Sequence, residues 1–148
     1  MNRLGLEIGT PAHGWVEIVV FIDGCEFERI DASYISATQH DDCLTLLADL
    51  TSTLESNVPV EIDFFLEPAL IRLKFETDKS AVSISRAEFS DSQHAKPGRG
   101  TYTPLGKFKL SQVNNAIVNA FFDLGRRIDR ESFQESWGYP FPEPQPHR

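Results

Sequence analysis

The stretch VPVEIDFFLEPALIRLKF, residues 58–75, decides the fold that we expect for this chain. Apolar and polar side chains alternate along it on both sides of a short break, which is the pattern of two half-buried β-strands. A four-residue loop at the break makes an antiparallel hairpin in which Phe64 faces Leu73 and Asp63 faces Lys74. The oppositely charged pair stabilises the solvent side of such a hairpin by about 0.2–1 kcal/mol.

A turn at 78–79 extends this hairpin into a three-stranded meander. The turn brings Val82 opposite Phe75, so the third strand adds to the same apolar face. A short strand within 105–110 follows later in the chain, with Phe108 directed inward. An apolar face of this size requires a covering layer.

A separate hairpin precedes the meander. Residues 15–22 form a run of β-branched and aromatic side chains that ends at 23–24, an Asp-Gly dipeptide suited to a two-residue type I′ turn. The turn pairs Ile22 with Cys25 and Val20 with Phe27, which places these four residues on one apolar face. This register also predicts that the cysteine is buried.

Two helices supply the covering layer. The first carries Leu44, Leu47 and Leu54 on one stripe, with Thr38 as its expected N-cap. Ser111 is the expected N-cap of the second. The apolar positions of that helix follow the spacing of a single helical face: Val113, Ile117, Ala120 or Phe121, Leu124 and Ile128.

Together these elements predict an α+β fold, a mainly antiparallel sheet with two helices packed on one face. The chain length suits one domain, which we place at 1–136. Residues 137–148 form an aromatic and proline-rich tail in which every second residue from Pro140 to Pro146 is proline. We expect the aromatic part of this tail to dock back onto its own domain.

The charge of the chain is unevenly distributed. Residues 17–67 hold twelve acidic side chains and one basic side chain, Arg29, a formal charge of −11 in a chain whose net charge is −8. A concentrated negative field repels nucleic acid and anionic lipid, and it accelerates encounters with a basic protein. We therefore expect a basic protein partner, with neither nucleic acid nor membrane as a ligand.

Neither an export signal nor a long apolar segment occurs in the sequence, so we expect a soluble cytoplasmic protein with Cys25 and Cys43 reduced and buried. His40, next to two aspartates and Cys43, is the densest cluster of reactive residues. The two aspartates oppose a thiolate there, and a solvated helix start is the better interpretation. The sequence contains no metal-binding or cofactor-binding motif, so we expect no metal, no cofactor and no enzymatic activity.

One loop keeps an alternative open. Residues 90–104 contain two glycines, two prolines and many small polar residues, and loops of this length inside a compact domain are often functional. If the protein is an enzyme or binds a small ligand, this loop is the expected lid. Its polar groups are then His94, Lys96, Arg99 and Tyr102.

The favoured hypothesis is a stoichiometric inhibitor of a basic protein. A small, acidic α+β domain without a catalytic motif is similar in general build to bacterial immunity proteins, which implies an immunity protein or antitoxin that neutralises a basic toxin. The residues expected to contact the partner are Glu26, Glu28, Asp31, Asp41, Asp42, Glu61 and Asp63. An adaptor or subunit of a larger assembly, which docks through a sheet edge or the tail, is the main alternative.

Overall fold

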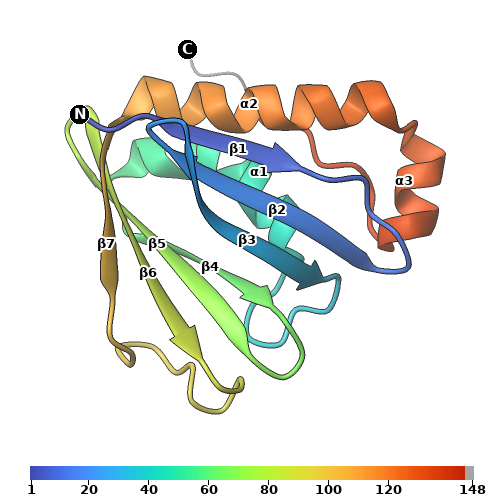
Figure 1. Cartoon of the computed structure of the whole chain (residues 1–148), viewed down its shortest axis with the longest axis horizontal. Coiled ribbons are helices and arrows are strands. Elements are labelled where there is room, and N and C mark those ends of the chain that lie inside the picture. Colours follow the sequence, from blue (N-terminus) through green and yellow to red (C-terminus); the bar gives the residue numbers. More distant parts are fainter. Residues whose placement is uncertain (146–148) are drawn as a thin grey trace.

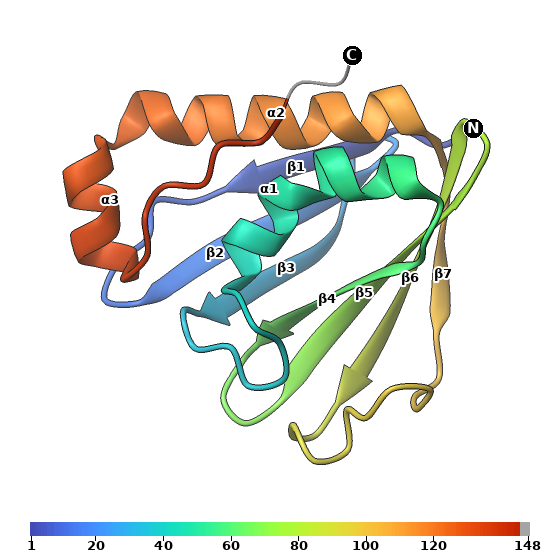
Figure 2. The same cartoon turned by 180° about the vertical axis from the view of Figure 1, so that it is seen from behind.

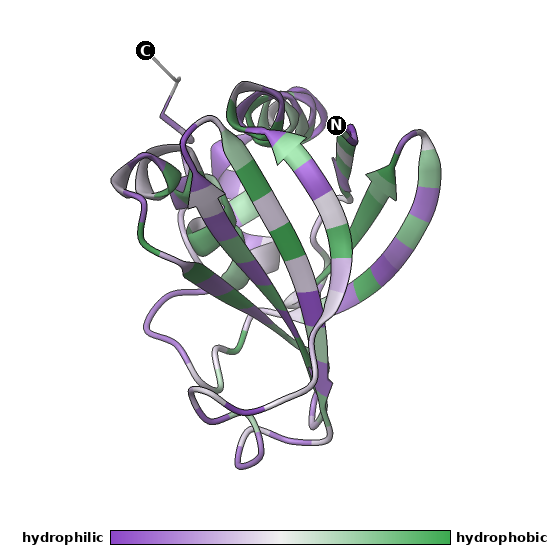
Figure 3. Ribbon diagram, turned by 90° about the vertical axis from the view of Figure 1, so that its left-hand side faces the viewer, coloured by the Kyte–Doolittle hydropathy of each residue, from purple (hydrophilic) through white to green (hydrophobic). Residues whose placement is uncertain are grey.

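The computed structural model describes residues 1–145 and shows an α+β fold built on two antiparallel sheets (Figure 1). The first sheet has the order β1-β2-β3 and the second the order β4-β5-β6-β7. The strands are β1 (Leu4–Ile8), β2 (Trp15–Ile22), β3 (Cys25–Ser33), β4 (Val60–Phe65), β5 (Leu70–Asp78), β6 (Ala81–Phe89) and β7 (Thr103–Lys109). Hydropathy alternates along these strands, as the banding in Figure 3 shows.

Three α-helices are present in the described part of the chain: α1 (Cys43–Thr53), which continues into the short 3-10 helix η1 (Leu54–Ser56), α2 (Leu110–Arg127) and α3 (Arg130–Trp137). Helix α2 lies along β1, and α1 lies between α2 and β4 (Figure 2). The main core cluster takes buried side chains from both sheets and all three helices. At the amino terminus, Asn2 pairs with β7 through a bond from its backbone N–H to the carbonyl of Lys107 (2.8 Å), so β7 is linked to the segment that leads into β1.

The meander has the predicted antiparallel topology with a different register. Phe64 pairs with Ile71 and Phe75 pairs with Ile84, a displacement of two residues from the expected pairing at each turn. The loops at 66–69 and 79–80 lie one residue away from the predicted positions, which accounts for the displacement. A two-residue slip preserves the alternation, so the expected apolar face is the observed one.

The first hairpin confirms the predicted turn and departs from the predicted pairing beyond it. Both turn residues have positive φ (53° and 84°), and Ile22 pairs with Cys25. A β-bulge next to Phe21 leaves Phe27 without a partner and pairs Val20 with Glu28. The expected burial of Cys25 and Phe27 is therefore wrong, because the end of this hairpin is exposed.

Both helix caps differ from the prediction. Helix α1 is capped by Asp42, whose carboxylate accepts a hydrogen bond from Thr45 N (3.2 Å). Helix α2 begins at Leu110, directly after β7, and no side chain caps it. The predicted short strand is confirmed as β7, in which Phe108 is buried. Strand β1 and helix α3 were not predicted.

The aromatic part of the tail docks on its own domain, as expected. Trp137 ends α3 and is fully buried, so this helix crosses the boundary predicted between the domain and the tail. The Phe141 ring packs edge-on against Phe121 and Phe133, and the Arg130 guanidinium lies 3.8 Å from its centroid. The last proline of the predicted series, Pro146, lies outside the described residues.

Candidate functional site

The outward side of the β1–β3 sheet gathers exposed acidic side chains. Along β2, alternate residues point into the core, and the others, including Glu17 and Val19, point outward. The register sets Asp31 of β3 opposite Glu17, and Arg29 and Glu7 on either side of Val19. We call this surface the acidic face, and its charged members are Glu7, Glu17, Glu26, Arg29 and Asp31, all exposed.

Arg29 occupies the middle of the acidic face. Its guanidinium forms ion pairs with Glu17 (2.5 Å) and Glu26 (2.6 Å), and the hydrogen bond that it donates to Glu26 is the main reason why the pKa of Arg29 is raised. All three side chains are about half exposed. With one base among four acids, the face keeps a formal charge of −3.

Two exposed aromatic residues flank these charges. Trp15 begins β2 on the side that carries Glu17, and 39% of its surface is accessible. Phe27 lies at the bulge beside Glu26 and is 42% exposed. Exposed tryptophan and phenylalanine rings next to charged groups are typical anchor residues of protein interfaces.

A groove of about 540 Å³ continues the acidic face toward α2. Strand β1 forms one wall and helix α2 the other. The groove is lined by Leu6, Glu7, Ile8, Gly9, Glu17, Val19, Ala120, Asp123, Arg126 and Arg127. Because it shares Glu7 and Glu17 with the acidic face, a partner on this face also has a concave feature available for one of its side chains.

The seven acids predicted to contact a partner do not all lie on the acidic face. Glu26 and Asp31 lie on the acidic face. Glu28 is half-buried and forms an ion pair with Arg86 of β6 (2.6 Å), which links the two sheets. Asp41 is exposed in the loop before α1.

Asp42 has a structural position instead of a surface one. Its side chain is 2% exposed, caps α1 and accepts a hydrogen bond from the indole Nε1 of Trp137 (2.8 Å). The bond joins the start of α1 to the end of α3, 95 residues away. A partner therefore has no direct access to this carboxylate.

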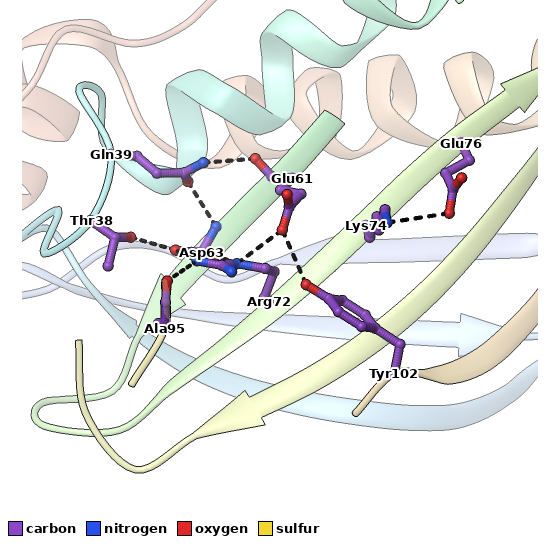
Figure 4. A network of polar contacts seen from close by, with 9 residues as sticks. All are labelled: Thr38, Gln39, Glu61, Asp63, Arg72, Lys74, Glu76, Ala95 and Tyr102. Carbon is purple, nitrogen blue, oxygen red and sulfur yellow. Dashed lines mark hydrogen bonds and ion pairs between the residues drawn. The ribbon is translucent and has the colours of Figure 1, made fainter. Parts of the chain in front are cut away.

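Asp63 is also buried, in the polar network of Figure 4. Its carboxylate binds Nε and Nη2 of Arg72 at 2.6 and 2.8 Å, and it accepts a further hydrogen bond from Thr38. Glu61, which is half-buried, lies 3.2 Å from Arg72 Nε and accepts a hydrogen bond from Tyr102. The hydrogen bond with Asp63 is the main reason why the pKa of Arg72 is raised, so the guanidinium stays charged inside the protein.

The loop that was predicted as a possible lid packs on the outer side of the second sheet. The carbonyl of Ala95 accepts a hydrogen bond from Arg72 Nη2 (2.7 Å), and Phe89 lies against the same guanidinium, 5.0 Å from centroid to Cζ. Gly100 has a φ of 103°, and a Cβ there would lie 2.6 Å from the Phe89 ring. A glycine is therefore required where the loop crosses this ring.

The four polar groups expected in the lid contact different partners. Tyr102 binds Glu61, whereas His94 binds Asp91 through Nδ1 (2.6 Å). The Ser90 hydroxyl lies 3.4 Å from that same Nδ1 atom, so these three residues do not form a serine–histidine–aspartate relay, which uses both ring nitrogens. Lys96 and Arg99 are exposed.

The cysteines have opposite environments. Cys43 is buried at the start of α1, and burial together with the charge of Asp42 raises the pKa of its thiol well above the usual range. Cys25 is exposed next to the hairpin turn, and both cysteines are free. A thiolate nucleophile at Cys43 is therefore unfavourable.

Sequence reasoning did not select five members of the site: Arg29, Phe27, which was expected to be buried, Glu7, Glu17 and Trp15. Glu7 was missed because β1 was not predicted. Glu17 and Trp15 lie in a strand that was predicted, and their alternation with the apolar residues of β2 already places them on its outward side. That alternation was the signal that could have selected them.

Comparison of the chain with protein-family models, with curated proteins and with solved structures gave no match. Within residues 1–145, no three histidine, cysteine or carboxylate side chains gather in a way that could hold a metal ion. The helices of this same part of the chain are too short or too polar to cross a membrane. The acidic face is thus the surface on which a functional proposal rests.

Proposed function

We propose that the protein is a stoichiometric binder of a basic protein and that it binds through the acidic face. The observation that carries this proposal is the concentration of four exposed acids around one base, on a rigid sheet, with exposed Trp15 and Phe27 beside them. The charges would steer and orient the partner, and the aromatic side chains would supply apolar contact area.

The finer form of the proposal is an inhibitor that neutralises a cationic toxin, in the manner of an immunity protein or antitoxin. Covering a basic protein requires surface complementarity and no chemistry of the protein's own. The polar networks inside the molecule, at Asp42 and around Arg72, stabilise the fold and support the sheets that present the face.

The test is a pull-down from cells of the native host with three proteins, at low and at high salt. The first is the wild type. The second, the face variant, carries Glu7→Lys, Glu17→Lys and Asp31→Lys. The third, the charge-matched control, carries Asp78→Lys, Glu88→Lys and Glu135→Lys, which are exposed acids of β5, β6 and α3.

Both variants have the same net charge, so a difference between them reports on position. We expect the wild type and the control to retain one basic protein in equal amount at low salt and to release it at high salt, because salt screens exposed charges. The face variant should retain little of it. Equal capture by the face variant and the control would refute the assignment of the acidic face.

A further inference from the structure

We propose that the basic partner adds an extended segment bearing lysine or arginine to the free edge of β3. This inference rests on the proposed function and specifies how the partner binds. It makes two predictions that the acidic face alone does not make: the contact includes backbone hydrogen bonds, and the partner segment is a strand.

The other three sheet edges carry side chains that occupy their backbone groups. On β1, the side-chain amide of Gln112 binds both the N–H and the carbonyl of Leu4 (2.8 and 2.6 Å), and Arg127 binds the carbonyl of Ile8. On β4, the side-chain amide of Gln39 donates to the carbonyl of Glu61 and accepts from the N–H of Asp63, both at 2.8 Å. Such contacts prevent an edge from pairing with another chain.

The edge of β7 is occupied in a similar way. The N–H of Lys107 donates to the Asn2 side chain (3.2 Å), and its carbonyl accepts from the Asn2 backbone (2.8 Å). In the described residues, no side chain binds the outward backbone groups of Arg29 and Asp31 on the β3 edge, and β4, the strand that lies nearest to this edge, forms no ladder with β3.

The hydrogen-bonding pattern between β2 and β3 shows which backbone groups of β3 have no partner in the sheet. The carbonyl of Glu17 accepts from Gly9, so the backbone of Glu17 is directed to β1. Asp31 pairs with Glu17 in the register, and the backbone groups of Asp31 are therefore directed away from β2. The backbone groups of Arg29, two residues earlier in β3, are directed away from β2 in the same way, and both residues are exposed.

The charge along the β3 edge indicates which kind of strand can bind there. Strand β3 carries the exposed acids Glu26 and Asp31 against one base, and Glu17 of β2 lies beside them. A second copy of β3 would bring like charges together across the new ladder, which is destabilising. A strand with basic side chains would instead place cations next to these carboxylates.

A direct probe is a seven-residue peptide that alternates lysine and valine. The controls are the same peptide with glutamate in place of lysine, and the lysine peptide with alternate backbone nitrogens methylated. Amide NMR of the full chain reports where each peptide binds. We expect the lysine peptide alone to bind, with shifted and exchange-protected N–H groups at Arg29 and Asp31.

Two substitutions separate the backbone contribution from the charge. Asp31→Pro removes an edge N–H that makes no bond to β2, and Asp31→Asn removes the charge and keeps the N–H. We expect the proline variant to bind the lysine peptide about tenfold more weakly than the asparagine variant, from the loss of a backbone hydrogen bond. Thermal unfolding of both variants verifies that they are folded.

The inference is overturned if the lysine peptide does not bind at low salt, or if its binding leaves the N–H groups of Arg29 and Asp31 unaffected. If Asp31→Pro is unfolded, the exchange protection in the wild type decides the question. Failure here is separable from failure of the proposed function. A host protein that the face variant loses and Asp31→Pro retains would support the acidic face and reject strand addition.

Discussion

Replacing Asp63 with alanine should strongly destabilise the protein, although this acid was expected on the sequence to contact a partner. The carboxylate and the Arg72 side chain are 4% and 6% exposed, and two charge-assisted hydrogen bonds of 2.6 and 2.8 Å join them. Alanine leaves the guanidinium buried without its main partner. Nη1 of Arg72 already has no hydrogen-bond partner in the described structure.

The magnitude follows from the burial of the pair. Breaking a buried ion pair by removing one member costs about 3–5 kcal/mol. Glu61, 3.2 Å from Arg72 Nε, remains and compensates part of the loss, so we expect about 3 kcal/mol, the lower end of that range. If the free energy of unfolding falls by about 2 kcal/mol for each molar increase in urea, the unfolding midpoint of the variant should lie about 1.5 M below that of the wild type.

The assay is equilibrium unfolding in urea, followed by tryptophan fluorescence. Asp31→Ala is the matched control, because it removes an exposed carboxylate from a strand and should change stability by no more than about 0.5 kcal/mol. A loss below about 1 kcal/mol for Asp63→Ala would contradict this reasoning, because the buried pair would then contribute little to stability.

Three further predictions concern other parts of the molecule. Gly100→Ala should destabilise the protein more than Gly98→Ala in a thermal melt, because both glycines have positive φ but only the first has an aromatic ring within 4 Å of the added Cβ; equal melting temperatures would contradict this packing. A thiol reagent should label Cys25 in the folded protein and Cys43 only after unfolding, and rapid labelling of both would contradict the burial of Cys43. Backbone and side-chain hydrogen bonds from Ser132 lower the pKa of Asp129, so its stabilisation is present above its unfolded pKa of about 4 and is lost as pH falls through the lower folded value. Asp129→Asn should weaken this acid dependence in pH-resolved unfolding, and an unchanged profile would argue against the contribution.

Sheet faces were more predictable than sheet registers. The alternation in β4 and β5 identifies Phe64 and Phe75 as core residues whichever turn is used, because a slip of two residues leaves every side chain on its own face. The position of a turn depends on the loop conformation. The sequence between Phe65 and Leu70 permits more than one loop with the same strand pattern.

The missed elements depend on long-range contacts. Strand β1 is short, has a glycine as its second residue and forms by pairing with β2. Helix α3 has only Phe133 and Trp137 as apolar residues, and its stability comes from the Asp129 cap and from the burial of those two rings. A local sequence pattern shows neither the pairing of β1 with β2 nor the burial of the two α3 rings.

Charge counting located the acidic region but did not separate surface acids from buried ones. Asp42 and Asp63 are buried because they have partners, Trp137 and Arg72, whose positions follow from the fold. Glu26 and Asp31 lie on an exposed strand, and only the strand pairing shows that Glu7 and Glu17 lie beside them. The register of the β1–β3 sheet therefore brings the members of the candidate site together.

The central claim, that the acidic face binds a basic protein, is tested most directly by association kinetics with the protein captured from the host. Association rates are measured over a range of salt concentrations for the wild type, the face variant and the charge-matched control. The account predicts similar rates and similarly steep salt dependence for the wild type and the control, and a slower rate with a shallower dependence for the face variant. Equal rates and slopes for the face variant and the control would contradict it.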